Sequence, residues 1–394
     1  MGEKAFRVLM IAPTPFFADR GCHVRIFEET KALQRLGNKV AICTYPLGRD
    51  LPGLEVHRTI AIPWYKKLEA GPSLHKLYID FLLLLKTLVV ARRFEPQIIH
   101  AHLHEGVVVG YVVSRLLGLP LVGDFQGSLT GELREHGFFK GWPLLFSFLR
   151  RGEILIDRLA DVIVASATKV AEESRSEFGA QRVVVALDGV DTAQFRPRGA
   201  PEGMGISIPS GRKVVVYLGL LNRYQGIDCL LEAIPLVLGG CERAHFLIMG
   251  YPNVEHYRRM AQELGVAGHV TFTGRIDYQE APRYLALGDV AVSPKLARTE
   301  SNGKLYNYMA CGLPTVAFDN PVNREILGEW GIYAQLGDAS SLARGLLEAL
   351  ANEAWAAELG ARLRERACRD FSWDSTARRI VKCYEEILEG TGKG

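Results

Sequence analysis

The chain has 394 residues, more than one ordinary domain needs, and 48% of them are hydrophobic, which excludes a disordered protein. Its 47 basic and 44 acidic residues leave a net charge of only +3, so composition does not support a nucleic-acid-binding function. The seven cysteines are scattered and include no Cys-x-x-Cys pair, so we interpret them as reduced thiols of a cytoplasmic protein and not as disulfides or a zinc site.

Short apolar runs alternate with helical patterns along the first half. We expect strands at residues 7–12, 39–44, 97–101, 120–124, 161–165 and 183–186, and a helix at residues 22–36 closed by Gly37. The apolar run at residues 77–91 contains Asp80 and Lys86 and is too short to span a membrane, so it predicts a buried helix. Residues 196–212, rich in glycine and proline, indicate a linker.

The same alternation restarts after the linker. We expect strands at residues 213–218, 244–249, 270–273, 290–293 and 315–318, with helices near residues 227–238, 303–311 and 375–388. Strands that alternate with helices form parallel sheets from βαβ units. The sequence therefore predicts an α/β protein of two doubly wound halves, at residues 1–195 and 213–370, followed by a helical segment at 371–394.

Polar side chains follow two strands of the first half. His100, His102 and His104 alternate, which would place them on one face of a strand, and Glu105 is the only acidic residue near them in sequence. We therefore expect no metal site and place His102 near a ligand cleft. Asp124 closes the next strand and is the ionisable group nearest to Gln126, whose amide cannot carry a proton at neutral pH.

Three loops have the composition of phosphate-binding segments. Residues 14–21 lack the Gly-x-Gly-x-x-Gly pattern of nicotinamide-dependent oxidoreductases, which disfavours that class. In the second half, Gly219 and Gly226 flank a loop whose backbone could approach a phosphate. The polar loop before Gly303 leads into a predicted helix that Ser301 or Asn302 could cap, and free N–H groups at such an end attract anions.

Three segments carry a resemblance to a known family. Residues 304–317, Lys-Leu-Tyr-Asn-Tyr-Met-Ala-Cys-Gly-Leu-Pro-Thr-Val-Ala, resemble the donor-site signature of retaining GT-B glycosyltransferases of family 4, also described as glycosyl transferases group 1. Residues 187–197, Leu-Asp-Gly-Val-Asp-Thr-Ala-Gln-Phe-Arg-Pro, are similar to the segment that links the two domains of that family. Phe-Ser-Trp at 371–373 resembles its closing signature. The resemblance covers essentially the whole chain.

The resemblance implies a GT-B fold, with two Rossmann-like domains facing across a cleft. Residues 1–195 would form the acceptor-side domain, 196–212 the linker, 213–370 the donor domain, and 371–394 a helix crossing back to the first domain. The implied activity is a metal-independent, retaining transfer of a hexose-like sugar from a nucleotide-sugar to a glycan or lipid-linked acceptor, in polysaccharide or glycolipid biosynthesis. No cofactor is implied, since the nucleotide-sugar is a substrate.

Several family positions differ in this chain. The two family glutamates fall on Thr299, next to Glu300, and on Asn307, while Gln126 replaces a histidine. The resemblance implies that Glu300 binds the sugar and Asn307 the ribose. The catalytic candidates are Glu300, Gln126 and Asp124. The donor-binding candidates are Gly219, Arg223, Gly226, Asn302, Gly303, Lys304, Leu305, Asn307 and Glu325, and the candidates for the acceptor and cleft are Arg20, Gly21 and His102.

Residues 219–226, here called the donor loop, follow the first strand of the second half. In the family this loop carries two basic residues that bind the diphosphate of the donor, and the resemblance places Leu220 and Gln225 at those positions. Arg223 and Lys304 are therefore expected to neutralise the diphosphate. Two alternatives remain open: another GT-B sugar-nucleotide enzyme, such as an epimerase, and a non-catalytic relic that binds sugar nucleotides. Residues 64–67 and 138–151 interleave aromatic and basic side chains, a pattern that fits either peripheral contact with the inner face of a membrane or ordinary core packing of the aromatic rings. No nucleic-acid partner is expected.

Overall fold

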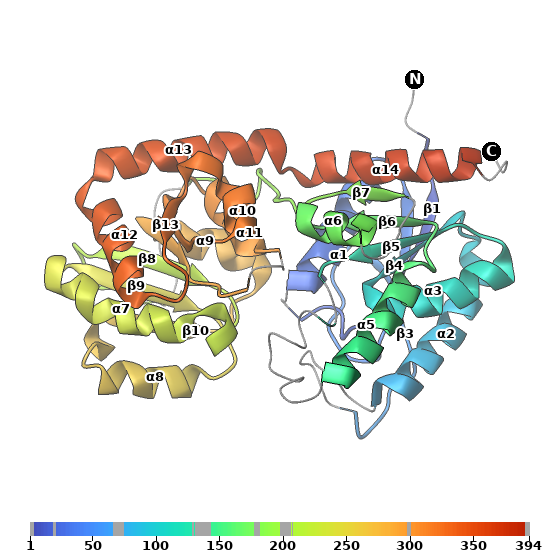
Figure 1. Ribbon diagram of the computed structural model, residues 1–394, viewed down its shortest axis with the longest axis horizontal. Helices are drawn as coiled ribbons and strands as arrows, with labels where there is room; N and C mark the ends of the chain where they lie inside the picture. The colour runs from blue at the N-terminus through green and yellow to red at the C-terminus, as the bar shows by residue number, and fades with distance from the viewer. Residues whose placement is uncertain are drawn as a thin grey trace. The chain divides into compact units, whose positions relative to one another are not determined.

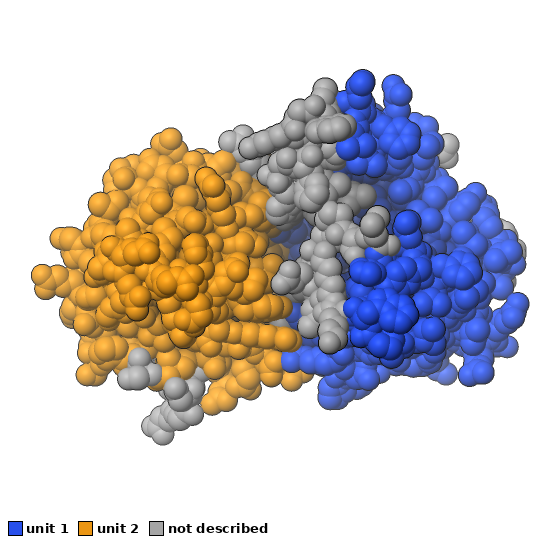
Figure 2. Space-filling model, turned by 90° about the horizontal axis from the view of Figure 1, so that it is seen from below, with its two compact units in different colours: residues 1–188, 299–301, 373–394 blue, residues 189–298, 302–372 orange. Residues whose placement is uncertain are grey.

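The protein is described here from a computed structural model, which describes residues 4–18, 21–65, 75–127, 130, 143–176, 182–197, 206, 208–297 and 301–390. The chain forms two compact units, coloured separately in Figure 2. Unit 1 comprises Met1–Asp188, Thr299–Ser301 and Trp373–Gly394, and unit 2 comprises Gly189–Arg298 and Asn302–Ser372.

Unit 1 is built on a seven-stranded parallel sheet in the order β3-β2-β1-β4-β5-β6-β7 (Figure 1). Its strands are β1 (Arg7–Ala12), β2 (Lys39–Thr44), β3 (Glu55–Arg58), β4 (Ile98–His102), β5 (Leu121–Phe125), β6 (Val162–Ala165) and β7 (Val183–Val185). The six expected strands are confirmed to within one residue at each end. The edge strand β3 escaped prediction because its sequence, Glu-Val-His-Arg, lacks an apolar run.

Helices cover both faces of this sheet. They are α1 (Gly21–Arg35), α2 (His75–Phe94), α3 (Leu103–Leu117), α5 (Pro143–Asp157), α6 (Thr168–Ser176) and α14 (Trp373–Gly390). Helices α2 and α3 pack on the sheet face that carries Leu9 and Ile11. Helices α1 and α14 pack together on the opposite face, where the Thr30 hydroxyl donates to Met10 Sδ over 3.2 Å.

The prediction that α2 is a buried helix is wrong. Its inner side chains, including Ile79 and Leu83, are completely buried, but Leu77 is 77% exposed and Phe81 is 58% exposed. Apolar side chains of this run therefore lie on two faces of α2, one packed in the core and one exposed at the surface. Among the described residues, no helix combines the length and the apolar character needed to cross a membrane.

Unit 2 is built on a six-stranded parallel sheet in the order β10-β9-β8-β11-β12-β13. Its strands are β8 (Lys213–Leu218), β9 (Ala244–Met249), β10 (Val270–Gly274), β11 (Val290–Ser293), β12 (Thr315–Phe318) and β13 (Ile332–Ala334). Its helices are α7 (Ile227–Gly240), α8 (Val254–Glu263), α9 (Ala281–Leu285), α10 (Gly303–Ala310), α11 (Pro321–Leu327), α12 (Ala339–Ala351) and α13 (Glu353–Asp370), with short 3-10 turns including η1 (Arg223–Gln225).

The expected pair of doubly wound parallel halves is thus confirmed. In a parallel sheet all strands end at the same edge, and ligands bind in the loops that follow those ends. The loops after β1, β4 and β5 meet in this way in unit 1, and those after β8 and β11 meet in unit 2.

Candidate functional site

Helix α10 of unit 2 is held at the strand ends by one tyrosine. The Tyr308 hydroxyl accepts a hydrogen bond from the backbone N–H of Leu218, at the end of β8, over 2.8 Å. It also donates to the carbonyl oxygen of Val292 in β11, over 3.4 Å. The N-terminus of α10 is therefore positioned beside the loop that follows β8. Tyr308 was not among the site residues expected from sequence, although it lies four residues after Lys304 and therefore on the same face of α10.

Asn302 lies at the position before α10 but does not cap it, contrary to expectation. Its side-chain N–H groups donate instead to Ser293 Oγ, over 3.0 Å, and to Asn323 Oδ1, over 2.8 Å. The helix N–H groups are thus left without a side-chain cap from Asn302, and the buried Oδ1 of Asn302 has no hydrogen-bond partner. Backbone donors at such a helix end can bind an anion.

Lys304, in the first turn of α10, carries a largely buried ammonium group. Its Nζ donates to Gln225 Oε1 over 2.7 Å and to the Tyr217 hydroxyl over 3.3 Å, and it lies 4.5 Å from the centre of the Tyr217 ring. Burial, together with the positive charge of Lys295, holds the pKa of Lys304 well below its usual range. Within the described part of the chain Lys304 forms no ion pair, so an anionic ligand would find an uncompensated positive charge here.

The glycines of the donor loop permit close packing around Lys304. Gly219 has φ +151°, and a Cβ atom there would lie 2.9 Å from Lys304 Nζ. Gly226 has φ +76°, and a Cβ atom there would lie 1.8 Å from the carbonyl oxygen of Pro294. Arg223, between these glycines, has an exposed side chain. The structure therefore brings Gly219, Gly226 and Lys304 together and leaves the Arg223 side chain at the surface.

The other donor-side candidates lie on α10 and α11. Gly303 is exposed, Leu305 is completely buried, and Asn307 is 8% exposed. Glu325 is half-buried on α11, where its carbonyl oxygen accepts from Arg366 over 2.9 Å. Glu300 lies outside the described residues.

The loop after β1 in unit 1 is ordered by His23 of α1. The backbone N–H of Ala18 donates to His23 Nδ1 over 2.8 Å, so the Nε2–H group faces the Thr14 hydroxyl, 2.5 Å away. Gly21 is the exposed first residue of α1, and a Cβ atom there would touch nothing within 4 Å. Arg20 lies outside the described residues.

Gln126 and Asp124 lie at the end of β5 with different surroundings. Gln126 is half-buried, and its Nε2 is buried without a hydrogen-bond partner, so it could donate to a ligand. Asp124 is completely buried and accepts from Arg25 Nη2 over 2.7 Å and from Arg25 Nε over 3.0 Å. Burial alone would raise the pKa of Asp124, but the charge of Arg25 and the imidazole rings of His100 and His102, whose nitrogens lie 3.7 and 3.9 Å from its carboxylate oxygens, hold that pKa well below the usual range. A buried carboxylate paired with Arg25 is poorly placed to donate a proton to a substrate, so this environment does not favour the acid–base role of Asp124, which stays a prediction.

The three histidines do not share a face as expected. β4 ends at His102, and His104 belongs to α3, where it lies 3.5 Å from carboxylate oxygens of both Glu153 and Asp157. His100 and His102 do share a face, with ring centres 4.8 Å apart. His102 has no exposed surface, and its expected place near a ligand cleft stays a prediction.

Sequence reasoning missed the residues that surround these histidines. Arg25 and Glu29, on α1, and Tyr384, on α14, are all at most 2% exposed. The signal was present in part, because Arg25 and Glu29 are four residues apart and therefore lie on one face of the helix. Their partners on other elements, however, lie between 71 and 284 positions away in the sequence, so no local pattern could reveal them.

Two family models match this chain. The model described as "Glycosyltransferase Family 4" matches residues 20–194, and that described as "Glycosyl transferases group 1" matches residues 212–352. The chain is 25% identical over 407 residues to a phosphatidyl-myo-inositol mannosyltransferase of Mycobacterium leprae, covering 98% of each chain. It is 30% identical over 273 residues to a GDP-mannose-dependent alpha-(1-6)-phosphatidylinositol monomannoside mannosyltransferase of Mycolicibacterium smegmatis, covering 65% of this chain and 69% of that one.

Solved structures share the fold along nearly the whole chain. Sucrose-phosphate synthase from Thermosynechococcus elongatus superposes with a TM-score of 0.83 at 19% identity, over 98% of this chain and 100% of that one. Anabaena HepE in complex with UDP and glucose superposes with a TM-score of 0.74 at 17% identity, over 96% of this chain and 99% of that one. At these identities the structural likeness establishes the GT-B fold of the two units and no more.

Proposed function

The chain belongs to the group 1, family 4 glycosyltransferases and has their GT-B fold, and we propose that it moves a hexose from a nucleotide-sugar to a glycan or lipid-linked acceptor. We further propose that the transfer retains the anomeric configuration and needs no metal ion. The acceptor class we favour is a lipid-linked one, in glycolipid or polysaccharide biosynthesis. The relatives named above support this preference, because their names refer to phosphatidylinositol acceptors.

The observation that carries the proposal is the environment of Lys304. Lys304 is half-buried, forms no ion pair within the described part of the chain, and lies in the first turn of α10. A nucleoside diphosphate would supply the missing negative charge, and the helix N–H groups would share in binding it. Gly219 would let the diphosphate approach the backbone of the donor loop, since it has no side chain.

A binding screen would identify the nucleotide of the donor. A mannosyltransferase relative is named as GDP-mannose-dependent, and HepE has been solved with UDP-glucose. Thermal shift with UDP, GDP and ADP would identify the base, because a ligand at 100-fold above its Kd stabilises the folded state by about 2.7 kcal/mol. Transfer from the corresponding nucleotide-sugar to a polyprenyl or inositol lipid then tests the enzyme. Binding without hydrolysis or transfer with any acceptor would favour the non-catalytic alternative.

The proposed chemistry needs no protein nucleophile. The leaving diphosphate takes the proton of the acceptor hydroxyl, while Lys304 and the N-terminus of α10 stabilise the negative charge that develops on it. Gln126 would orient the sugar through its free amide N–H groups. Product NMR tests the retaining outcome: an axial anomeric bond conserved from the donor is expected, and an inverted bond would refute it.

Metal independence has its own test. Turnover in EDTA should equal turnover with added magnesium or manganese, because Lys304 and helix dipoles take the electrostatic role of a cation. A loss of turnover in EDTA that magnesium or manganese alone restores would contradict this mechanism.

A membrane-bound acceptor fits the outer surface of unit 1. Two helices in contact, α2 and α3, expose apolar side chains at four-residue intervals, and α5 adds further ones. These exposed residues are Leu77, Phe81, Leu85 and Val89 of α2, Val108, Val112 and Leu116 of α3, and Leu144, Phe148 and Leu155 of α5. Basic residues flank them: Lys76, Lys86, Arg92 and Arg93 on α2, Arg115 on α3, and Arg150 and Arg151 on α5. Apolar stripes bordered by basic residues are typical of helices that lie on anionic membranes.

We therefore propose peripheral binding through α2, α3 and α5 at the inner, cytoplasmic face of the membrane. Of the aromatic and basic segments predicted from sequence at 64–67 and 138–151, residues 66–67 and 138–142 lie outside the described part of the chain, and Trp64 is 71% exposed. Flotation with vesicles containing anionic lipid should carry the wild type, and Phe81→Glu should reduce the bound fraction. Leu236→Glu, at a 48% exposed site on α7 of unit 2, is the matched control and should bind as the wild type does. Absence of binding at low salt would refute the proposal.

A further inference from the structure

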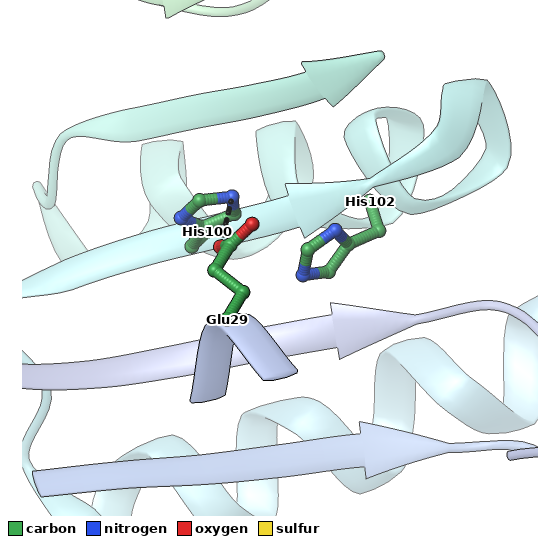
Figure 3. A group of neighbouring side chains, drawn as sticks. All are labelled: Glu29, His100 and His102. Carbon is green, nitrogen blue, oxygen red and sulfur yellow. Dashed lines mark ion pairs between the residues drawn. The ribbon is translucent and has the colours of Figure 1, made fainter. Parts of the chain in front are cut away.

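A second cluster of ligand-type side chains lies in unit 1, on the sheet face covered by α1 and α14. It consists of Glu29 from α1 and of His100 and His102 from β4 (Figure 3). All three residues have no exposed surface. One ligand atom from each lies within 4.8 Å of the ligand atoms of the other two. The Glu29 side chain reaches from the helix toward the His100 ring, and His102 lies beside it on the same strand.

The polar atoms of this cluster lack ordinary hydrogen bonds. Both carboxylate oxygens of Glu29, Nε2 of His100 and both ring nitrogens of His102 are buried without a hydrogen-bond partner. A buried polar atom without a partner costs about 1–3 kcal/mol, and such atoms are rare in folded proteins. Five such atoms on three neighbouring side chains indicate that a ligand with several coordination positions belongs there.

The separation of the atoms fits a metal ion. His100 Nε2 lies 3.4 Å from Glu29 Oε1, a long distance for a hydrogen bond. Two ligands bound tetrahedrally to zinc at about 2.0–2.2 Å lie roughly 3.4 Å apart. The other ring nitrogen of His100, Nδ1, lies 2.5 Å from the Tyr384 hydroxyl. That contact would fix the ring with Nε2 directed at the metal, as the outer partners of metal-bound histidines do.

The charge of the cluster also fits a divalent cation. Three carboxylates lie around the single positive charge of Arg25. Its guanidinium nitrogens lie 3.8 Å from a carboxylate oxygen of Glu29, 2.7 Å from one of Asp124 and 2.7 Å from one of Asp188. Arg25 supplies one positive charge among these three carboxylates, and a bound metal ion would add positive charge to the same cluster.

We propose that Glu29, His100 and His102 form a buried structural site for one transition-metal ion of the zinc type. Nitrogen and carboxylate ligands suit zinc, with a water molecule in the fourth position. The ion would join α1 to β4 and, through Tyr384, the sheet to α14. Because the ligands have no exposed surface, the ion would enter as the chain folds. The Glu105 considered from sequence is not a ligand, since it pairs with Lys76 on the other face of the sheet.

The test begins with the wild-type chain, unfolded and refolded with zinc or cobalt. Elemental analysis after gel filtration should find about one zinc per chain, and the cobalt form should show the visible absorption of a tetrahedral ion. X-ray absorption at the zinc edge should find two imidazole ligands. Refolded wild type without bound metal, or cobalt in a six-oxygen environment, would overturn the proposal, and neither measurement depends on a variant.

Two variants locate the site. His102→Gln and Glu29→Gln should each lower metal content at least tenfold. His245→Gln is the matched control, because His245 is a buried histidine of unit 2 that hydrogen-bonds to Thr271 over 2.8 Å. It should keep the metal. Circular dichroism checks that each variant folds, and full metal content in a folded His102→Gln protein would overturn the assignment.

Discussion

The Nζ of Lys304 lies 2.7 Å from Oε1 of Gln225, which occupies one of the two positions where the family resemblance implies a basic residue. A neutral side-chain amide at that position therefore holds the ammonium group of Lys304 in place. The donor diphosphate would then depend more on Lys304 than on the exposed Arg223.

Diphosphate affinity should therefore depend on both residues but unequally. A charge-assisted hydrogen bond contributes about 1.5–3 kcal/mol, so Lys304→Ala should weaken nucleoside diphosphate binding by about ten- to a hundredfold. Arg223→Ala should lose less, because its side chain is exposed and its charge is screened by solvent. Calorimetry with the diphosphate and with the free nucleoside distinguishes the roles. Equal losses for both ligands would mean that these residues support the fold and not the phosphate.

Diphosphate binding should also take up a proton. Burial and Lys295 lower the pKa of Lys304 in the free protein, and a bound anion would raise it again. Affinity should consequently fall as pH rises through the lowered pKa. Calorimetry in buffers of different ionisation enthalpy measures the proton uptake, which Lys304→Met should abolish. Proton release on binding to the wild type would contradict this account.

Glu300 and Asn307 should affect different steps. Glu300→Ala should mainly lower kcat, since sugar orientation matters most in the transition state. Asn307→Ala should mainly weaken nucleotide binding, because its side chain is expected to bind the ribose. Steady-state kinetics with one nucleotide-sugar separates kcat from KM. Unchanged turnover in Glu300→Ala would show that its assignment is wrong.

Gly226 should not tolerate a side chain. A Cβ atom there would overlap the Pro294 carbonyl oxygen, and φ +76° is strained for alanine by about 1–3 kcal/mol. Gly226→Ala should therefore destabilise unit 2 by at least that amount and weaken diphosphate binding. Gly239→Ala, in α7 with no atom within 4 Å of the added Cβ, should be neutral or stabilising by up to about 1 kcal/mol. Urea unfolding compares them, and similar stability of the two variants would refute the prediction.

Two arginines of α1 should differ sharply in their contribution to stability. Arg25→Met leaves Asp124 and Asp188 without their cation, and breaking a buried ion pair costs about 3–5 kcal/mol. Arg35→Met removes an exposed pair with Asp374, at 2.6 Å, which contributes less than about 1 kcal/mol. Unfolding in urea should show this difference, and equal losses would mean that the Arg25 cluster is not a stabilising network.

The sequence alone determined the fold class and the strands other than β3 and β13. Buried parallel strands are continuous apolar runs, so residues 7–12, 213–218 and 315–318 could be recognised without any partner. The glycines at 219 and 226 and the helix beginning at 303 were found in the same way, because turn chemistry and helix ends are local. The resemblance at residues 304–317 then indicated the family, which the family models confirm.

Only the tertiary structure decided which side chains meet. Arg25 and Asp124 are 99 positions apart, and His100 and Tyr384 are 284 apart, so no local period could pair them. Packing of α1 on one sheet face buried Asp124, the candidate acid, against Arg25. It also placed Glu29 beside two histidines that had no acidic neighbour at ligand spacing in the sequence except Glu105. Periodicity reports which face of an element is apolar, whereas burial and pairing of charges depend on what packs against that face.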